Sequence, residues 1–504
     1  MIEHIDVPCP GTLTLLQKNV LPEAFGVADP DSTLPCDGTK DLQLKVAASA
    51  GAVLGSLVFG YLGDIKGRKK MYGFELVIIV VATLGQAVAA GGQSINVISV
   101  LTMWRFVMGF GVGGDYPSSA VIASEYFESV YRGRILSSVF AFQGLGTLTA
   151  AIVTLICLAA FGDSDASLDK IWRVVLGFIC IVGVLAVVFR FKIPEPPRYI
   201  FFVERHPRPV GEFLDRYQVN PGPETVNDIL RQARGQSWPD FVEVLCREWK
   251  QLACLSYAWF VVDFSFYGLG LNSSVIIAKT NLFGTRSTDS FAGRLKGICY
   301  GNLTLLAGAI PGHLACIAFI DRIGRRYLQA VGFIAVAFLF LIMGFLSYLP
   351  DRDGSDDDAS PQNDKVPWVA FFAIYCISNF FQNFGANSTT FILPAEHFPT
   401  RYRSTAYGIA AASGKLGSVI TQILLFIYAV VSATGLIPTK FLEETKQRSL
   451  ESLTADEINM DILRHPQDHQ PVDRVPNDVA MNANREVNGD GRPPQPSLEL
   501  RTRY

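Results

Sequence analysis

Charge is scarce in this sequence. Asp, Glu, Lys and Arg make up 18% of the 504 residues, against 49% hydrophobic residues, and the mean hydropathy is +0.28. A soluble chain of this length needs considerably more charge to cover its surface. The composition therefore disfavours a soluble protein and favours one that is embedded in a lipid bilayer.

A basic surplus and metal-ligand motifs are lacking as well. The formal net charge is −3, whereas nucleic-acid binders carry an excess of Lys and Arg, so we expect no nucleic-acid partner. The nine cysteines form no Cys-x-x-Cys pair or Cys/His cluster of metal-ligand spacing. No nucleophile–base constellation is present either. We therefore expect neither an enzyme nor a bound metal or other cofactor. No basic segment followed by an apolar stretch opens the chain, so no signal peptide is expected.

Long apolar runs, by contrast, are abundant. About ten of them reach the roughly 20 residues that a helix needs to cross a hydrocarbon layer of about 30 Å. They lie near residues 45–64, 73–92, 97–124, 134–160, 172–193, 249–278, 296–320, 327–349, 366–393 and 408–436. The pattern predicts an all-α, multi-pass membrane protein.

Polar stretches divide these runs into two groups. The domains that we expect are an extracellular segment (1–44), an N-terminal helix bundle (45–193), a cytoplasmic central loop (194–248), a C-terminal helix bundle (249–436) and a disordered tail (437–504). Basic loops, such as residues 66–70 and 322–326, alternate with acidic or neutral ones. The positive-inside rule places the basic loops in the cytoplasm.

One loop motif occurs twice, once in each group of apolar runs. Asp64-Ile-Lys-Gly-Arg68-Lys recurs as Asp321-Arg-Ile-Gly-Arg325-Arg. Such an echo indicates two parallel repeats related by an axis along the membrane normal, with a binding site between them. We predict that Asp64 and Asp321 occupy equivalent positions at the cytoplasmic face.

A second motif is duplicated with the same spacing. Glu125-Tyr-Phe is followed by Tyr-Arg132, and Glu396-His-Phe is followed by Tyr-Arg403. Both copies fall at predicted cytoplasmic helix ends. We interpret the two glutamates as partners in ion pairs between loops, in preference to a role in binding substrate.

Among the charged residues inside apolar runs, three stand out. They are Arg105, Asp115 and Asp263. Because an unpaired charge within a bilayer is costly, each is expected to face the bundle interior and to serve a function. Asp115 follows a glycine-rich stretch that permits close helix packing or local unwinding. We group Arg105 with the residues of the two duplicated motifs as gating or cytoplasmic-loop residues.

Several passages resemble one known family. Gly113-Gly-Asp115-Tyr116-Pro is similar to the signature of the phosphate:proton symporters of the major facilitator superfamily, the high-affinity phosphate carriers of fungi and plants. Further agreement, in the same order, lies around Gln143, at residues 259–267, 383–391 and 398–404, and around Lys415. The loop motif at Asp64 resembles the superfamily's cytoplasmic loop signature. The resemblance runs from about residue 36 to 451.

This resemblance implies a major facilitator fold of two pseudo-symmetric bundles that moves inorganic phosphate with protons across the plasma membrane by alternating access. It implies that Asp115 and Asp263 accept protons and that Lys415 supplies positive charge. It assigns phosphate binding to Asp115, Tyr116, Gln143, Trp259, Asp263, Tyr267, Asn387 and Lys415. Phenol, amide and indole donors beside a carboxylate suit dihydrogen phosphate, which both accepts and donates hydrogen bonds. We predict that these residues converge on one cavity near mid-membrane.

The family has twelve helices, and the sequence shows about ten, so the first helix and most of the last are expected to be missing. Two alternatives therefore stay open. The first is a major facilitator carrier of another small solute, such as a sugar or an organic ion, because Pro194-Glu-Pro-Pro-Arg198-Tyr also occurs in sugar carriers. The second is a transport-inactive phosphate carrier or sensor.

Overall fold

The computed structural model describes residues 38–90, 96–127, 130–161, 165–200, 238–280, 282–283, 291–347 and 366–423. All regular elements within these ranges are helices. The expected extracellular segment up to residue 37, most of the expected central loop and the tail fall outside the described residues. So does the whole of a second compact unit, Thr454–Tyr504.

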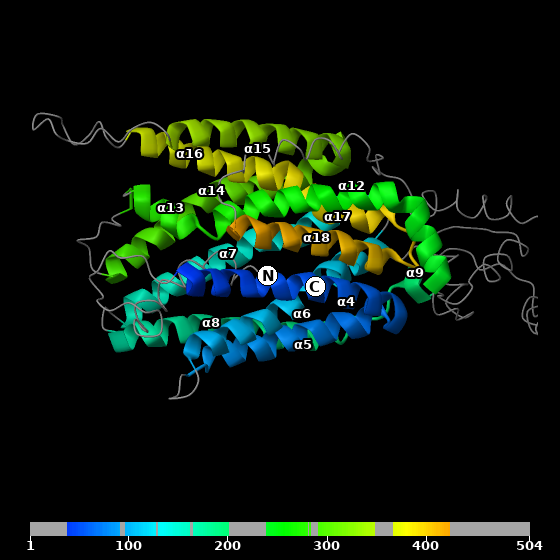
Figure 1. The fold of residues 1–504 in the computed structure, drawn as a ribbon, viewed down its shortest axis with the longest axis horizontal. Coiled ribbons are helices and arrows are strands. Elements are labelled where there is room, and N and C mark those ends of the chain that lie inside the picture. The colour runs from blue at the N-terminus through cyan, green and yellow to red at the C-terminus, as the bar shows by residue number, and fades with distance from the viewer. Residues whose placement is uncertain are drawn as a thin grey trace, which may run out of the picture. The chain divides into compact units, whose positions relative to one another are not determined.

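Five long helices form the N-terminal half (Figure 1). They are α4 (Gly38–Lys66), α5 (Arg68–Ala87), α6 (Val97–Tyr126), α7 (Arg132–Phe161) and α8 (Asp165–Arg190), followed by the short α9 (Pro197–Tyr199). Asn96 precedes α6 in an extended conformation, and its side-chain oxygen accepts the backbone N–H of Ile98. This is an N-cap, which fixes where the helix starts.

The C-terminal half is also helical throughout its described part. Its elements are α12 (Trp238–Gly270), α13 (Ser273–Thr280), α14 (Phe291–Ile323), α15 (Arg325–Ser347), α16 (Val366–Phe381), η2 (Gln382–Ala386), α17 (Asn387–His397) and α18 (Arg403–Ile423). The element η2 is a single π-helical turn that joins α16 to α17 without a break. Such turns are frequent at functional sites in helices.

Nine helical stretches of the described residues are long and apolar enough to cross a membrane. They match the first nine predicted spans, with shifted ends. The predicted span 73–92 is observed at Arg68–Ala87, because Gly67 alone separates α4 from α5. The predicted span 249–278 is wrong as one helix: α12 starts earlier, at Trp238, and ends at Gly270. The tenth predicted span, 408–436, begins in α18 and then passes out of the described residues.

The two halves meet along two helix pairs. Helix α4 packs on α18, and α7 packs on α14. Figure 1 shows α18 lying beside α4 and α12. Helices α4 and α14 end in the two copies of the aspartate motif, and α7 and α18 follow the two copies of the glutamate motif. The contacts between the halves therefore pair each aspartate helix with the glutamate-motif helix of the opposite half.

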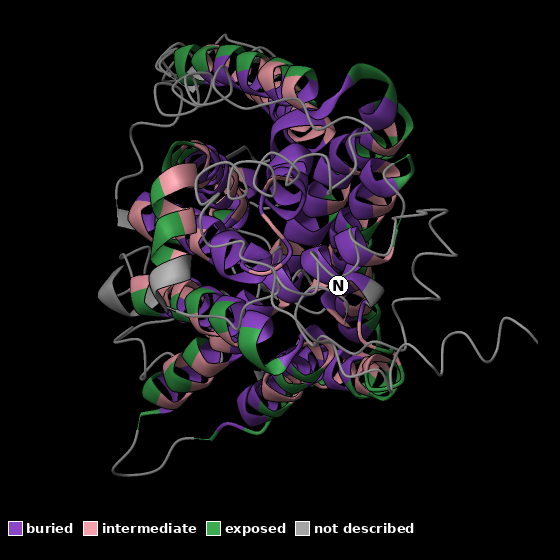
Figure 2. Ribbon diagram, turned by 90° about the vertical axis from the view of Figure 1, so that its right-hand side faces the viewer, coloured by how far each residue is buried: buried purple, intermediate pink, exposed green. Residues whose placement is uncertain are grey.

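Burial follows the pattern of a protein in lipid. Arg68, Arg325 and Glu125 are at most 1% exposed, whereas Phe189 and Phe345 are 67% and 68% exposed. Figure 2 shows buried residues between the helices and exposed ones on their outward faces. Buried charge combined with an apolar outside is the arrangement that a bilayer favours, since lipid tails are apolar and leave charges unsolvated.

Candidate substrate-binding site

The two aspartate motifs form the same tight turn. Gly67 and Gly324 have φ angles of 103° and 102°, and they are the positive-φ glycines of the described residues. Only glycine enters this region without steric cost, so it alone permits the abrupt change from one helix to the next. We call the end of the helices that carries these turns the basic end.

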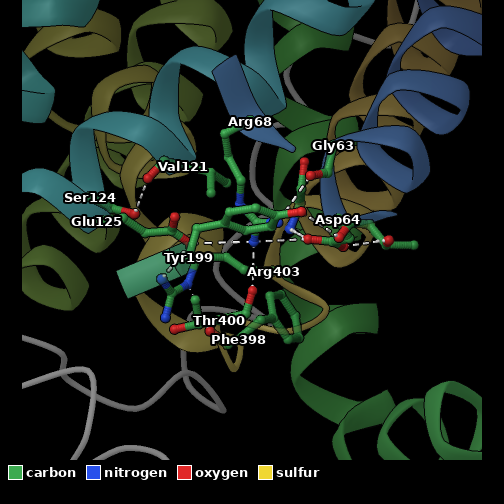
Figure 3. A network of polar contacts seen from close by, with 12 residues as sticks. Gly63, Asp64, Arg68, Val121, Ser124, Glu125, Tyr199, Phe398, Thr400 and Arg403 are labelled. Carbon is green, nitrogen blue, oxygen red and sulfur yellow. Dashed lines mark hydrogen bonds and ion pairs between the residues drawn. The ribbon is translucent and has the colours of Figure 1, made fainter. Parts of the chain in front are cut away.

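The carboxylate of Asp64 caps a helix of the opposite half (Figure 3). Its Oδ1 accepts the backbone N–H of Ser404 at 3.2 Å, and its Oδ2 accepts the N–H of Thr405 at 2.7 Å. The hydroxyl of Thr405 adds a third bond at 2.6 Å. A negative charge at the N-terminus of α18 is stabilised by the free N–H groups and by the helix dipole. Asp64 thus ties α4 to α18.

Arg68 and Glu125 extend this network between the halves. Arg68 pairs with Asp64 at 3.0 Å and with Glu125 at 3.4 Å, and it donates to the carbonyl of Thr400 at 2.6 Å. Glu125 also pairs with Arg403 at 3.1 Å. The ion pairs expected for Glu125 are therefore present, and the pair with Arg403 crosses from the N-terminal to the C-terminal half (Figure 3).

The second motif copy repeats these contacts. Asp321 accepts the backbone N–H of Arg134 in the first turn of α7 at 3.2 Å. Arg325 pairs with Asp321 at 3.0 Å and with Glu396 at 3.1 Å. Each aspartate thus caps the first turn of a helix in the other half, and each arginine joins its aspartate to the glutamate of its own half. The basic end is held closed by two equivalent sets of contacts.

Two residues of the predicted gating group, Arg132 and Arg105, lie near opposite ends of the helices. Arg132 starts α7 and is 1% exposed, close enough to Arg403 for their charges to interact. Arg105 lies near the other end of α6, where its guanidinium donates to the carbonyl of Leu44 at 3.1 Å. Our grouping of Arg105 with the cytoplasmic-loop residues is wrong, because about 20 helical residues, or roughly 30 Å, separate it from Glu125.

A small central cavity lies between the halves. Its volume is about 10 Å³, about what one water molecule needs. The lining comes from α6, α7, α12 and α17, and consists of Tyr116, Phe140, Gln143, Trp259, Asp263, Phe266, Tyr267, Asn387 and Phe391. Tyr116, Gln143, Trp259, Asp263, Tyr267 and Asn387 are predicted substrate-binding residues. The structure brings these six together.

Lys415 of α18 supplies the charge of this site. Its ammonium donates to the hydroxyls of Tyr116 at 2.8 Å and Tyr267 at 2.6 Å, and lies 3.4 Å from the carboxylate of Asp263. The two tyrosine hydroxyls are themselves 3.3 Å apart. Lys415 and Asp263 are 2% and 3% exposed, so their charges are compensated mainly by each other. This pair, together with the two phenols, joins α6 of one half to α12 and α18 of the other.

Close helix packing positions the aspartate. The indole of Trp259 donates to Asp263 one turn later on α12. A Cβ atom on Gly414 would lie 2.2 Å from Cδ1 of Trp259. Only glycine at this position lets α18 approach α12 closely enough to bring the neighbouring Lys415 to Asp263.

Asp115 does not line the central cavity, contrary to our prediction. It faces α5 and α8, where its carboxylate lies 2.7 Å from the guanidinium of Arg190. Glu75 lies 3.5 Å from the same guanidinium and accepts a hydrogen bond from Ser118 at 2.8 Å. Tyr116 points to the cavity and Asp115 points away, because adjacent helical residues differ in direction by about 100°.

Glu75 and the three phenylalanines of the central cavity are not among the residues predicted from the sequence. Glu75 was detectable, since it is an acid within an apolar run, the criterion that selected Asp263. Phe140, Phe266 and Phe391 had no such signal, because one phenylalanine in an apolar helix looks like any other.

Comparison with known proteins gives a consistent result. The model of the family described as "Sugar (and other) transporter" matches residues 39–455. A repressible high-affinity phosphate permease of Neurospora crassa is 35% identical over 83% of this chain and 79% of its own length. An inorganic phosphate transporter of Saccharomyces cerevisiae is 34% identical over 84% of this chain and 79% of its own. A putative inorganic phosphate transporter of rice is 34% identical over 81% and 82%.

Among solved structures, the proton:xylose symporter XylE matches with a TM-score of 0.65. The match covers 90% of this chain and 97% of XylE at 19% identity. At that identity the likeness shows the fold alone, which is the major facilitator fold that the family resemblance implied.

Proposed function

Because this chain belongs to the sugar (and other) transporter family of the major facilitators, a family of multi-pass membrane carriers and not of enzymes, we propose that it carries inorganic phosphate together with protons. Its relatives in Neurospora, yeast and rice are named as phosphate permeases or transporters. The observation that carries the proposal is the cluster of Lys415, Asp263 and two tyrosine hydroxyls at the central cavity.

This cluster fits the chemistry of dihydrogen phosphate. The lysine compensates the single negative charge, and the phenols, the Gln143 and Asn387 amides and the Trp259 indole donate to the phosphate oxygens. The Asp263 carboxylate can accept from a phosphate hydroxyl. The charge of Lys415 is partly compensated by Asp263. The affinity for a phosphate monoanion should therefore be low enough for the anion to be released. In the closed conformation Lys415 is occupied by the tyrosines, so entry of phosphate requires that these contacts open.

Two groups of carboxylates support proton coupling. A proton on Asp263 would free Lys415 to compensate the phosphate alone, so proton and anion binding favour one another there. Away from the cavity, Glu75 and Asp115 share one guanidinium, that of Arg190. One cation compensates only one of two carboxylates, so a proton on Asp115 or Glu75 would relieve their repulsion.

The closed basic end supports alternating access. The two aspartate caps and the Glu125–Arg403 pair hold the halves together at that end. By the positive-inside rule the basic end is cytoplasmic. Rocking of the halves would break these contacts and expose the central cavity to the cytoplasm. We further propose that the plasma membrane is the site of action.

The alternatives make different demands on the site. A sugar offers no charge that Lys415 could compensate, so a lysine–aspartate pair in the cavity disfavours a neutral cargo. A sensor without transport would bind phosphate but would not accumulate it. Uptake of radiolabelled phosphate by a host that lacks its own phosphate carriers separates these functions. We expect saturable uptake that a protonophore abolishes; uptake no higher than in the untransformed host would contradict the proposal.

A further inference from the structure

A second, larger cavity adjoins the central one. Its volume is about 90 Å³, against about 10 Å³ for the central cavity. One water needs roughly 10–15 Å³ on this measure, so the second cavity has room for a tetrahedral oxyanion and the central one does not. Gln143 and Phe266 line both cavities. The two cavities therefore adjoin at these shared side chains.

The second cavity lies on the side away from the basic end. On α12 it is lined by Leu269 and Gly270, beyond Asp263, and on α7 by Thr147, beyond Gln143. Both helices start at the basic end and run away from it. A solute coming from the opposite end would meet this cavity before the central one.

The lining combines apolar side chains with several polar ones, and it carries no fixed charge. None of the described lining residues is Lys, Arg, Asp or Glu. Its polar members are Gln143, Thr147, Ser273, Asn302, His313, Tyr375, Asn379, Gln382 and Asn383. Amide and hydroxyl groups donate hydrogen bonds to an anion without holding it by a full charge, as a transient site requires.

A run of asparagines connects the two cavities along one helix. Asn387 of the central cavity donates to the side-chain oxygen of Asn383 at 3.2 Å. Asn383 and Asn379 line the second cavity, and each donates to a backbone carbonyl one turn earlier. The π-helical turn Gln382–Ala386 lies within this run. The amides thus offer donors at successive turns from one cavity to the next.

His313 adds a buried, unsatisfied nitrogen to the second cavity. The side chain is 3% exposed, and its Nδ1 has no hydrogen-bond partner. Its ring packs edge-on against Phe140 of α7 at 5.7 Å, so it sits where the halves meet. A buried polar atom without a partner is costly, and a ligand with a hydroxyl group would satisfy it.

We propose that this second cavity is a staging site, where a phosphate monoanion binds after entry and before Lys415 and its tyrosines open the central site. The proposal rests on the phosphate transport proposed above. Gln143 would then pass the anion from one site to the other, and Asn302 and His313 would hold it only at the staging site.

Equilibrium binding of radiolabelled inorganic phosphate to the full chain in lipid nanodiscs tests this. We expect wild-type binding to have a tight component from the central site and a weaker one from the staging site. Lys415→Met leaves Asp263 negative beside the central site, so the affinity of the tight component should fall about 10- to 100-fold. A weaker component should persist in Lys415→Met. It should fall at least a further ~10-fold when Asn302→Leu or His313→Leu is added. Thr304→Val, two residues from Asn302 but in neither lining, is the matched control and should change nothing.

Three results bear on the proposal in distinct ways. Loss of all saturable binding in Lys415→Met alone would show a single site and overturn the staging site, while the proposed function would stand. A residual component that both second-site variants leave unchanged would overturn it too. No saturable binding by the wild-type chain would overturn the proposed function and, with it, the staging site. Asn302 and His313 lie at different positions. If one of the two variants fails to fold, binding to the other still tests the staging site.

Discussion

Lys415 is buried against two phenol oxygens and one carboxylate, and the family resemblance assigns all three partners to the phosphate site. What the sequence could not show is that the lysine donates to both tyrosine hydroxyls at the same time. These contacts are set by the approach of α12 to α18, which depends on the packing of many side chains.

Removing the charge of Asp263 should separate transport from coupling. Asp263→Asn keeps the shape of the side chain and its bond to Trp259 but no longer balances Lys415 or takes up a proton. We expect accumulation driven by a pH gradient to be lost, while exchange of phosphate across the membrane survives. Uptake and counterflow assays in proteoliposomes measure the two separately. Accumulation with unchanged pH dependence would show that Asp263 is not the coupling residue.

Asp115 is expected to behave differently, because it faces Arg190 and not the central cavity. Asp115→Asn should leave phosphate affinity within about threefold of wild type, below 1 kcal/mol, and should change the dependence of uptake on external pH. Equilibrium binding and uptake at several pH values provide the two measurements. A tenfold or greater loss of affinity would instead support the direct contact with phosphate that the family resemblance implied.

At the scale of helices, substitution of either capping aspartate should open the basic end to the same extent. Asp64→Asn and Asp321→Asn each weaken bonds from backbone N–H groups to a charged acceptor, which are worth about 1.5–3 kcal/mol. The closed basic end should therefore open roughly 10- to 100-fold more often in either variant.

The native Cys316 thiol can be used to detect opening of the basic end, so no cysteine has to be introduced for labelling. Its sulfur is buried between α14 and α7, 3.6 Å from the hydroxyl of Ser137. Maleimide labelling of Cys316, followed by peptide mass spectrometry, should accelerate in both aspartate variants. Asp169→Asn breaks an ion pair with Arg173 within α8 and is the control. A rise in only one of the two variants would contradict the equivalence of the motifs.

The packing of α18 on α12 gives a further prediction. Gly414→Ala places a methyl group within 2.2 Å of Trp259, so the helices must separate or the indole must move. We expect a loss of stability of about 1–3 kcal/mol, as for other overpacked positions, together with weaker phosphate binding. Thermal unfolding and binding assays measure both, and Gly344→Ala, whose Cβ meets no atom within 4 Å, is the control. Wild-type behaviour of Gly414→Ala would show that the close approach is not required.

For the whole molecule, the sequence predicted the membrane spans and the duplication well, because apolar run length and motif repetition are local signals. The helix ends were harder. Charged residues at Trp238–Lys250 suggested a loop, but they extend α12 beyond the apolar run, since Glu, Lys and Arg are good helix formers. The direction of Asp115 depends on helix rotation, which adjacent residues alone do not fix. The cavities depend on where side chains from several helices meet.

Phosphate and protons are proposed to move together through the site of Lys415 and Asp263. Uptake of radiolabelled phosphate into proteoliposomes that contain only this chain, with an imposed pH gradient, measures this. We predict accumulation that follows the gradient, that arsenate (another tetrahedral oxyanion) inhibits and xylose does not, and that Lys415→Met abolishes. Accumulation that ignores the gradient, or that Lys415→Met leaves intact, would show that phosphate and protons do not move together through this site.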